Sequence, residues 1–233
     1  MRLQLEVRVW RGEIAESRHR VQMAVCDPGG RRIAGTEFPD LPTTFRSAAK
    51  PFQLVPLVER GHADRLGFGP TEIALMAASH TGSPRHLEVV RGILARIGRG
   101  ESDLACGIDE PLDPASRQAL RDGSASPSPV YHNCSGKHAG MLALCQAEGW
   151  PTAGYETPEH PLQQLMHRTV SEICGLAVVQ VPWAIDGCGV CVFAMPLSAM
   201  ARGYARLAAA RPWACPRRRP IRRRGSRGRP TYR

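Results

Sequence analysis

A serine and a lysine that could act as a nucleophile and its base lie three residues apart, at Ser47 and Lys50. The segment 47–60 is predicted to be helical, and this spacing places both side chains on one helical face. A desolvated, neutral lysine amine can take the proton of a serine hydroxyl and prepare it for acyl transfer. The alternative is a serine that caps the helix beside an exposed lysine. The motif alone favours that alternative, because Ser-x-x-Lys is common by chance.

Lysine is rare in this chain, which has only Lys50 and Lys137 beside 29 arginines. An arginine cannot lose its proton in a protein, whereas a buried lysine can. The two lysines are therefore predicted to occupy positions where arginine will not serve. Chance retention at two surface sites is the alternative.

Two segments rich in cysteine and glycine could form a metal site. The first segment, HNCSGKHAG, spans residues 132–140, and its first seven positions carry six polar side chains. Within it, Cys134 shares a helical face with Lys137 or with His138. The second segment, DGCGVC, runs from residue 186 to residue 191, and its glycines allow close backbone approach. One thiolate from each segment, with a histidine or a water, could bind zinc. The spacing of a zinc finger is absent, and a buried, reduced pair at Cys188 and Cys191 is the alternative.

A further pair, Ser79 and His80, lies in a loop between two predicted helices. It could be catalytic, but without context we interpret it as a cap for the helix that follows at residue 84.

Strands, then helices, then strands again predict an α+β, mixed layered fold. The first forty residues alternate apolar and polar side chains and predict an antiparallel meander with a turn at 27–30. The segment VVQVPWAIDGCGVCVFAM predicts two short buried strands around a glycine-rich turn. Helices are predicted over 47–60, 71–78, 84–97, 135–148, 158–173 and 197–209.

The net charge of +10 comes from the end of the 233-residue chain. Residues 211–233 hold ten arginines and no acid, whereas residues 1–210 carry 21 basic and 21 acidic side chains. This change predicts a domain over 1–210 and an Arg/Pro-rich tail over 211–233. The tail is either a disordered cationic segment or an out-of-frame translation, and its composition favours the latter. An N-terminus without a signal-peptide pattern and the lack of an 18-residue apolar stretch predict a cytoplasmic protein without a membrane span.

Four motifs, in this order and spacing, resemble those of the L-asparaginase II family, which is distinct from the classical bacterial and the N-terminal threonine asparaginases. They are RSAAKPFQ, ALMAASHTGSPRH, HNCSGKHAGML and IDGCGVCVFAMPLSAMA, and the resemblance extends from about residue 4 to about residue 209. It implies that L-asparagine is hydrolysed to L-aspartate and ammonia by a homodimer. It also implies a fold similar to those of serine β-lactamases and some glutaminases.

The resemblance implies an acyl-transfer mechanism. Ser47 would be the nucleophile, Lys50 its base and Ser79 a second hydroxyl that relays protons or orients the substrate. Ser47 would attack the side-chain amide carbon, ammonia would leave, and water would hydrolyse the β-aspartyl ester. Backbone N–H groups near Ser47 would stabilise the oxyanion.

The resemblance also implies a zinc site formed by Cys134, Lys137 and Cys188, with a water as the fourth ligand. A lysine ligand must be a neutral amine, which would explain why arginine does not replace it. Asp186 would also orient the metal-bound water. Three residues would hold the substrate: Arg46, His138 and Asp186.

The chain departs from the family pattern at its C-terminal end. Members of the family are longer and carry another active-site lysine there, whereas no lysine follows Lys137 in this chain. We therefore expect a frameshift or truncation near residues 207–212 that makes the 1–210 domain incomplete and could abolish activity. Three hypotheses follow, in this order: an asparaginase with a lost C-terminus, a catalytically inactive zinc-binding module, and a nucleic-acid-binding protein that uses its arginine-rich tail.

Overall fold

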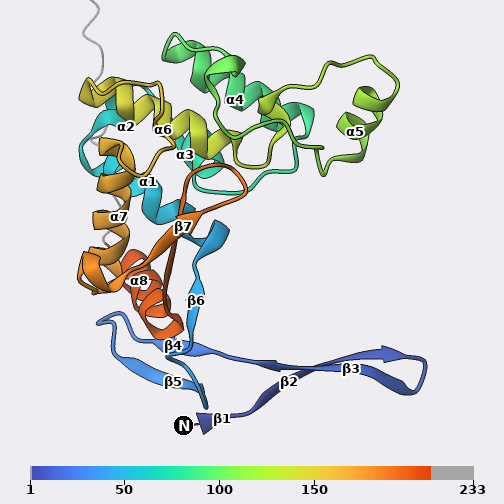
Figure 1. Cartoon of the computed structure of the whole chain (residues 1–233), viewed down its shortest axis with the longest axis vertical. Helices are drawn as coiled ribbons and strands as arrows, with labels where there is room; N and C mark the ends of the chain where they lie inside the picture. Colours follow the sequence, from blue (N-terminus) through green and yellow to red (C-terminus); the bar gives the residue numbers. More distant parts are fainter. Residues whose placement is uncertain (1, 211–233) are drawn as a thin grey trace, which may run out of the picture.

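The structure, a computed structural model, describes residues 2–210, and the predicted tail at 211–233 lies outside the described residues. Helices and strands mix along the chain as the sequence predicts, so the α+β fold is confirmed. Figure 1 shows most helices gathered above the strands and one long β-hairpin that projects to the side.

The strands form three small sheets. Their bounds are β1 (Arg2–Leu3), β2 (Leu5–Arg11), β3 (Ile14–Val21), β4 (Ala24–Cys26), β5 (Arg32–Thr36), β6 (Pro42–Thr44), β7 (Trp183–Ile185) and β8 (Cys191–Pro196). The first sheet has the order β1-β5-β4, the second is the β2–β3 hairpin, and the third has the order β6-β8-β7. Only the β1–β5 pair is parallel among the described strands. The third sheet therefore joins strands from both ends of the described chain.

Eight α-helices and four short 3₁₀ helices are described. The α-helices are α1 (Lys50–Glu59), α2 (His62–Arg65), α3 (Pro70–Met76), α4 (Pro84–Arg96), α5 (Pro114–Arg121), α6 (Ser135–Glu148), α7 (Pro161–Cys174) and α8 (Leu197–Ala209). The 3₁₀ helices are η1 (Arg46–Ala49), η2 (Glu101–Asp103), η3 (Pro129–Tyr131) and η4 (Val178–Gln180). Gly149 and Gly175 end α6 and α7 with φ angles of 71° and 70°, a left-handed conformation that glycine adopts without strain.

Helix α6 lies at the centre of the helical part, where its residues 135–145 are all buried. It packs against α1, α3, α4 and α7. Two glycines allow α3 to approach closely. A Cβ atom at Gly136 would lie 2.8 Å from the Leu75 carbonyl oxygen, and one at Gly140 would lie 2.8 Å from the Met76 sulfur. The start of α6, which carries Cys134 and Lys137, is thereby fixed against α3.

Helix α8 connects the N-terminal sheet to α7. The Arg202 guanidinium donates hydrogen bonds to the carbonyls of Gly30 (3.4 Å) and Cys174 (3.1 Å). Arg206 donates to the carbonyls of Glu172 (3.1 Å) and Ile173 (2.9 Å). These arginines bind carbonyls in the last turn of α7, where the helix itself offers few N–H partners.

Two strand predictions need correction. The first forty residues contain the predicted antiparallel turn at 27–30, but they do not form one meander. The strand predicted across HRVQMAV breaks after Val21. The Gln22 side chain there accepts hydrogen bonds from Thr36 Oγ1 (2.6 Å) and from the Phe38 N–H (3.1 Å). The two strands predicted around the glycine-rich turn exist, but only β8 is buried. Because β7 is the edge of its sheet, all three of its residues are exposed.

Among the helices between residues 2 and 210, none is both long and apolar enough to span a bilayer.

Candidate active site

Ser47 lies on η1, which is held from two sides. The Phe45 N–H donates to the Phe193 carbonyl of β8 (2.8 Å), and the Tyr204 hydroxyl of α8 donates to the Ala48 carbonyl (2.8 Å). Between these contacts, Arg46 has a positive φ angle of 48°. It is the one non-glycine residue within 2–210 whose φ is positive. Such backbone strain persists where the surroundings enforce it, and it clusters at functional sites. The strained residue precedes the predicted nucleophile directly.

Ser47, Ser79 and Lys50 form a chain of hydrogen bonds. Lys50 Nζ lies 2.6 Å from Ser79 Oγ and 3.3 Å from the Ala78 carbonyl, and Ser79 Oγ lies 3.2 Å from Ser47 Oγ. Both serines are exposed, whereas Lys50 is only 2% exposed. The structure thus brings together the three residues predicted to be catalytic, with Ser79 between the other two.

His80 fixes the loop that carries Ser79. Its backbone N–H donates to the Asn133 carbonyl (3.2 Å), and its Nε2 lies 2.8 Å from Ser135 Oγ. The Ser135 hydroxyl itself donates to the Val130 carbonyl (2.8 Å), so the proton between the two side chains belongs to His80 Nε2. His80 Nδ1 then accepts from the Gly82 N–H (3.1 Å). Burial, with the positive charge of nearby groups, lowers the pKa of His80 to about 4, which keeps this neutral tautomer.

Cys134, Lys137 and Cys188 are buried together beneath the serine chain. They are 6%, 5% and 3% exposed, and Lys137 Nζ donates to Cys188 Sγ at 2.9 Å. A hydrogen bond from the Cys188 thiol, followed by the charges of Lys137 and Lys50, lowers the pKa of Cys134 to about 6. The same hydrogen bond, together with burial, raises the pKa of Cys188. Cys134 is therefore the more acidic thiol of the pair, and its Sγ donates to Asn133 Oδ1 at 3.1 Å.

Lys50 connects the serine chain to this buried trio. Burial lowers the pKa of Lys50, and the neighbouring Cys134 side chain opposes that shift. Lys50 Nζ thus faces Ser79 on one side and Cys134 on the other. A single buried amine thus lies between the exposed hydroxyls and the buried Cys134 side chain.

The predicted substrate-binding residues separate into two places. Arg46 and Asp186 form an ion pair (3.3 Å) at the surface beside Ser47. Asp186 lies in the tight turn after β7, where its backbone N–H donates to the Val190 carbonyl (2.9 Å). His138, by contrast, is completely buried, and its Nδ1 lies 2.6 Å from the Tyr155 hydroxyl.

His138 also carries a buried atom without a hydrogen-bond partner. Tyr155 accepts from the Ala105 N–H (2.9 Å) and donates its own proton to His138 Nδ1, so the histidine proton resides on Nε2. In the part of the chain that is described, this Nε2 makes no hydrogen bond. It lies beside Cys188, and burial lowers the pKa of His138 to about 4. A neutral histidine with an unpaired Nε2–H therefore lies beside Cys188 in the described part of the chain.

The sequence over residues 7–224 matches the model of the L-asparaginase II family. The chain belongs to the L-asparaginase II family. No curated protein matches it. Membership of the L-asparaginase II family indicates an asparaginase-type amidohydrolase and a small-molecule substrate.

Two residues of this L-asparaginase II site were missed from the sequence. His80 was interpreted as part of a helix cap, although it stands next to Ser79 and holds the loop in place. Tyr155 lies 17 residues beyond His138 in a segment without a motif, so no sequence signal could have found it. Both residues contact or hold neighbours for which the sequence predicts a functional role.

Proposed function

We propose that this member of the L-asparaginase II family hydrolyses the side-chain amide of L-asparagine through a covalent ester on Ser47. The single observation that carries the proposal is the hydrogen-bonded chain from Ser47 Oγ through Ser79 Oγ to Lys50 Nζ. An exposed hydroxyl joined through a second hydroxyl to a buried amine is suited to serve as an activated nucleophile. The backbone strain at Arg46, directly before Ser47, favours this serine over Ser79 as the attacking group.

The reaction proceeds in two steps. Ser47 Oγ attacks the amide carbon while its proton passes to Ser79 and the Ser79 proton passes to Lys50. The carbon–nitrogen bond then breaks, and ammonia leaves with the proton that Lys50 returns to the nitrogen through Ser79. Water attacks the resulting β-aspartyl ester, loses a proton through Ser79 to Lys50, and releases L-aspartate with Ser47 restored.

The substrate is held at the mouth of the site by Arg46 and Asp186. The Arg46 guanidinium pairs with the α-carboxylate, and the Asp186 carboxylate pairs with the α-ammonium group. Their mutual ion pair, 3.3 Å apart, presents both charges side by side at the surface. Backbone N–H groups near Ser47, at the start of η1, stabilise the oxyanion. Because His138 is fully buried, we propose that it orients Cys188 rather than contacting the substrate.

Zinc fits the buried trio. Two sulfur donors and one nitrogen donor converge there. Residues 2–210 contain no cluster of three histidine, cysteine or carboxylate side chains, because Lys137 is the third member of the trio. Cys134, Lys137 and Cys188 would hold the ion, and its chemistry would be to polarise a bound group as a Lewis acid. Lys137 would have to bind as a neutral amine.

The test is ammonia release from L-asparagine by the purified full chain, measured beside Ser47→Ala. A matched control is Ser102→Ala, which removes an exposed hydroxyl far from the site in sequence. We expect release by the parent chain and by the control, and at least a 100-fold loss in Ser47→Ala. Activity that survives Ser47→Ala would overturn the ester mechanism. A parent chain that binds zinc one-to-one without releasing ammonia would support the inactive zinc-binding module instead.

A further inference from the structure

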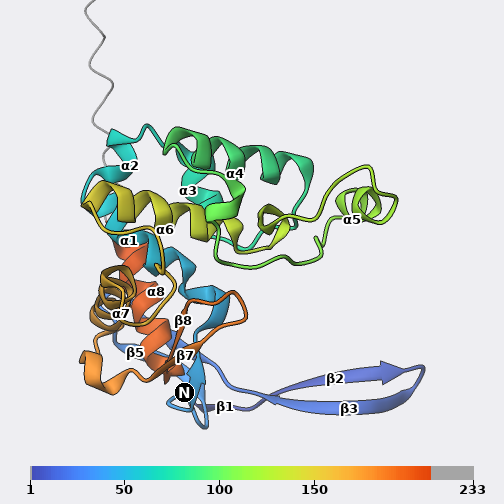
Figure 2. The same cartoon turned by 45° about the horizontal axis from the view of Figure 1, so that its top comes forward.

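A hollow of about 520 Å³ lies beside Ser79, between helices α3 and α4, and is called the α3–α4 hollow below. The two helices pack against each other, and Figures 1 and 2 show them side by side in the helical part of the molecule. Ala78 and Ser79, in the loop after α3, are part of its lining. Its volume is in the range of about 300–1,000 Å³ that is typical of small-molecule sites. Ammonia has a single heavy atom, so its release leaves most of this space unused.

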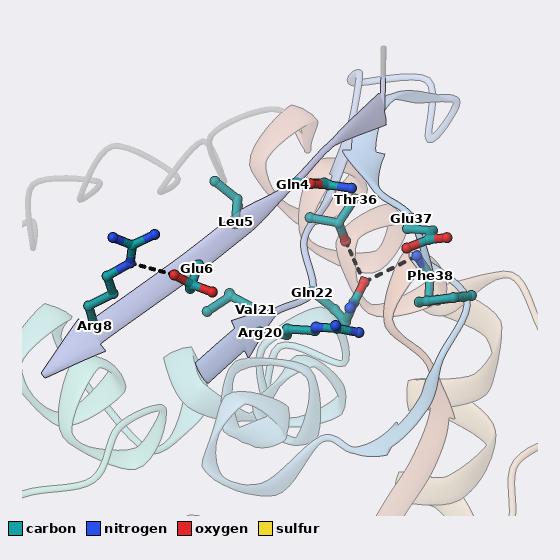
Figure 3. Close-up of a pocket in the computed structure, with 10 residues that line it drawn as sticks. All are labelled: Gln4, Leu5, Glu6, Arg8, Arg20, Val21, Gln22, Thr36, Glu37 and Phe38. Carbon is teal, nitrogen blue, oxygen red and sulfur yellow. Dashed lines mark hydrogen bonds and ion pairs between the residues drawn. The ribbon is translucent and has the colours of Figure 1, made fainter. Parts of the chain in front are cut away.

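A second hollow, of about 460 Å³, lies at the base of the β2–β3 hairpin and is drawn in Figure 3. Its lining comes from residues between positions 4 and 38. It includes none of the residues predicted for catalysis, substrate binding or zinc binding. Of the two, the α3–α4 hollow is therefore the one that adjoins the serine chain.

The lining of the α3–α4 hollow combines apolar side chains with a positive charge. Ala74 lies on the α3 side, and Val89 lies on the α4 side. The exposed Arg85, in the first turn of α4, belongs to the lining and forms no ion pair within residues 2–210. No carboxylate of the described chain is among the lining residues. These features favour a ligand that has an apolar part and a negative charge.

His86 holds the cationic end of the α3–α4 hollow close to Ser79. Its Nδ1 lies 2.9 Å from Ser83 Oγ, which fixes the ring to the loop before α4. The ring centroid also lies 5.4 Å from that of His80, the residue that follows Ser79 in the chain. The first turn of α4, which carries Arg85, is therefore positioned beside this serine.

The position of the leaving nitrogen connects the hollow to the reaction. In the proposed mechanism, Lys50 returns a proton to this nitrogen through Ser79. The nitrogen must therefore come within hydrogen-bond distance of Ser79 Oγ, which is about 3 Å. Because Ser79 also lines the α3–α4 hollow, a substituent on the nitrogen can extend into that space. The Arg46–Asp186 pair holds the other end of the substrate in the same mechanism.

We infer that the chain also hydrolyses β-aspartyl dipeptides, in which the side-chain amide nitrogen of the aspartyl residue belongs to a second amino acid. This inference rests on the proposed function. The second amino acid binds in the α3–α4 hollow, where its carboxylate pairs with Arg85 and its apolar side chain contacts Ala74 and Val89. Arg85 is then a residue that determines specificity for this class of substrate.

The dipeptide follows the same two steps and requires no further reactant. Ser47 Oγ bonds to the amide carbon, and the carbon–nitrogen bond breaks. The second amino acid leaves with the proton that Lys50 returns to its nitrogen through Ser79. Water then hydrolyses the β-aspartyl ester, so each dipeptide and one water molecule yield L-aspartate and a free amino acid.

The first experiment measures binding without turnover. Titration calorimetry on the full chain carrying Ser47→Ala compares β-aspartyl-leucine with L-asparagine. We expect the dipeptide to bind about tenfold more tightly, which is the effect of one charge-assisted hydrogen bond. Arg85→Gln, added to Ser47→Ala, should remove this difference. The matched control is Arg168→Gln on α7, which removes an exposed arginine outside the hollow and should keep the difference. Equal affinities for the two compounds, or a difference that survives Arg85→Gln, would overturn the inference.

The second experiment separates this inference from the proposed function. Leucine release from β-aspartyl-leucine and ammonia release from L-asparagine are measured side by side on the parent chain and on Arg85→Gln. We expect both products from the parent chain. In Arg85→Gln, kcat/KM should fall about tenfold for the dipeptide and should stay at the parent value for L-asparagine, which has no group that reaches the hollow. Ammonia release without leucine release would overturn this inference alone, whereas the absence of both products would overturn the proposed function with it.

Discussion

Lys50 Nζ donates a 2.6 Å hydrogen bond to Ser79 Oγ, although Ser47 is the serine one helical turn away from it. Ser79 in turn lies 3.2 Å from Ser47. The second hydroxyl, which comes from the loop after α3, thus stands between the residues of the Ser-x-x-Lys motif. The proposed base, Lys50, therefore acts on Ser47 through Ser79, so substitutions of Lys50 and Ser79 should interrupt the same proton path.

We predict that Ser79→Ala and Lys50→Met impair the same proton path. Each should reduce kcat for ammonia release by about 100-fold or more, since this is the usual contribution of a positioned base. The double variant should be no worse than the more impaired single variant, because two residues of one relay are not additive. Steady-state kinetics on the three variants checks this. Multiplied losses in the double variant would mean that Lys50 reaches Ser47 by a separate route.

We predict that the buried trio binds one zinc ion per chain. Cys134→Ser, Cys188→Ser and Lys137→Arg should each reduce the bound metal at least tenfold, because each removes a donor or keeps it protonated. Cys191→Ser is the control: Cys191 is equally buried, three residues from Cys188, and outside the trio. Metal content by mass spectrometry, with circular dichroism to verify folding, is the measurement. Loss of zinc from the control would point instead to the Cys188–Cys191 pair as the ligand set.

Acid should destabilise the chain through His80. Its pKa is about 4 in the folded state, below the value of about 6.5 in an unfolded chain. The unfolded state therefore binds more protons, and stability falls as the pH drops from about 6.5 towards 4. In His80→Asn, whose amide oxygen can still accept from Gly82, thermal unfolding should depend less on pH across that window. The control His19→Asn, an exposed histidine on the hairpin, should retain the parent slope.

Two glycines on helices should respond oppositely to alanine. Gly136→Ala places a methyl group 2.8 Å from the Leu75 carbonyl oxygen, and this overpacking should cost about 1–3 kcal/mol of unfolding free energy. Gly92→Ala in α4 meets nothing within 4 Å and should stabilise by about 0.5–1 kcal/mol. Chemical denaturation of both variants tests the packing of α6 on α3. A neutral Gly136→Ala would show that the two helices separate easily.

Much of the helical framework follows from local sequence. The predicted bounds of the helices at 135–148 and 197–209 are those of α6 and α8, since glycine or proline marks their ends. Helix α7 begins at Pro161, three residues later than predicted, because the His160 side chain accepts from the Leu162 N–H and caps it. Helices α2 and α5 were not predicted: α2 has only four residues, and α5 buries only Ser116.

The site could be predicted only in part. The Ser47–Lys50 motif lies within one helical turn, so the sequence alone predicts that the two side chains are close. The position of Ser79 depends instead on how a loop 29 residues after Lys50 folds back. Likewise, 51 residues separate Lys137 from Cys188, and their contact depends on packing that no local pattern encodes. The family resemblance supplied these long-range pairs. The roles of the three catalytic, three substrate-binding and three zinc-binding residues named from the sequence stay predictions, which the variants above test.

The contacts of α8 also bear on the order in which the chain can fold during synthesis. Arg202 binds the carbonyl of Gly30 across 172 residues of sequence, and Cys26 Sγ donates to the Ser198 carbonyl over the same separation. The ribosome has therefore released almost the whole described chain before the first sheet gains its supporting helix. Contacts of such long range slow folding and leave early strands unpaired for longer. The N-terminal strands of a nascent chain are consequently the segment for which chaperone protection matters most.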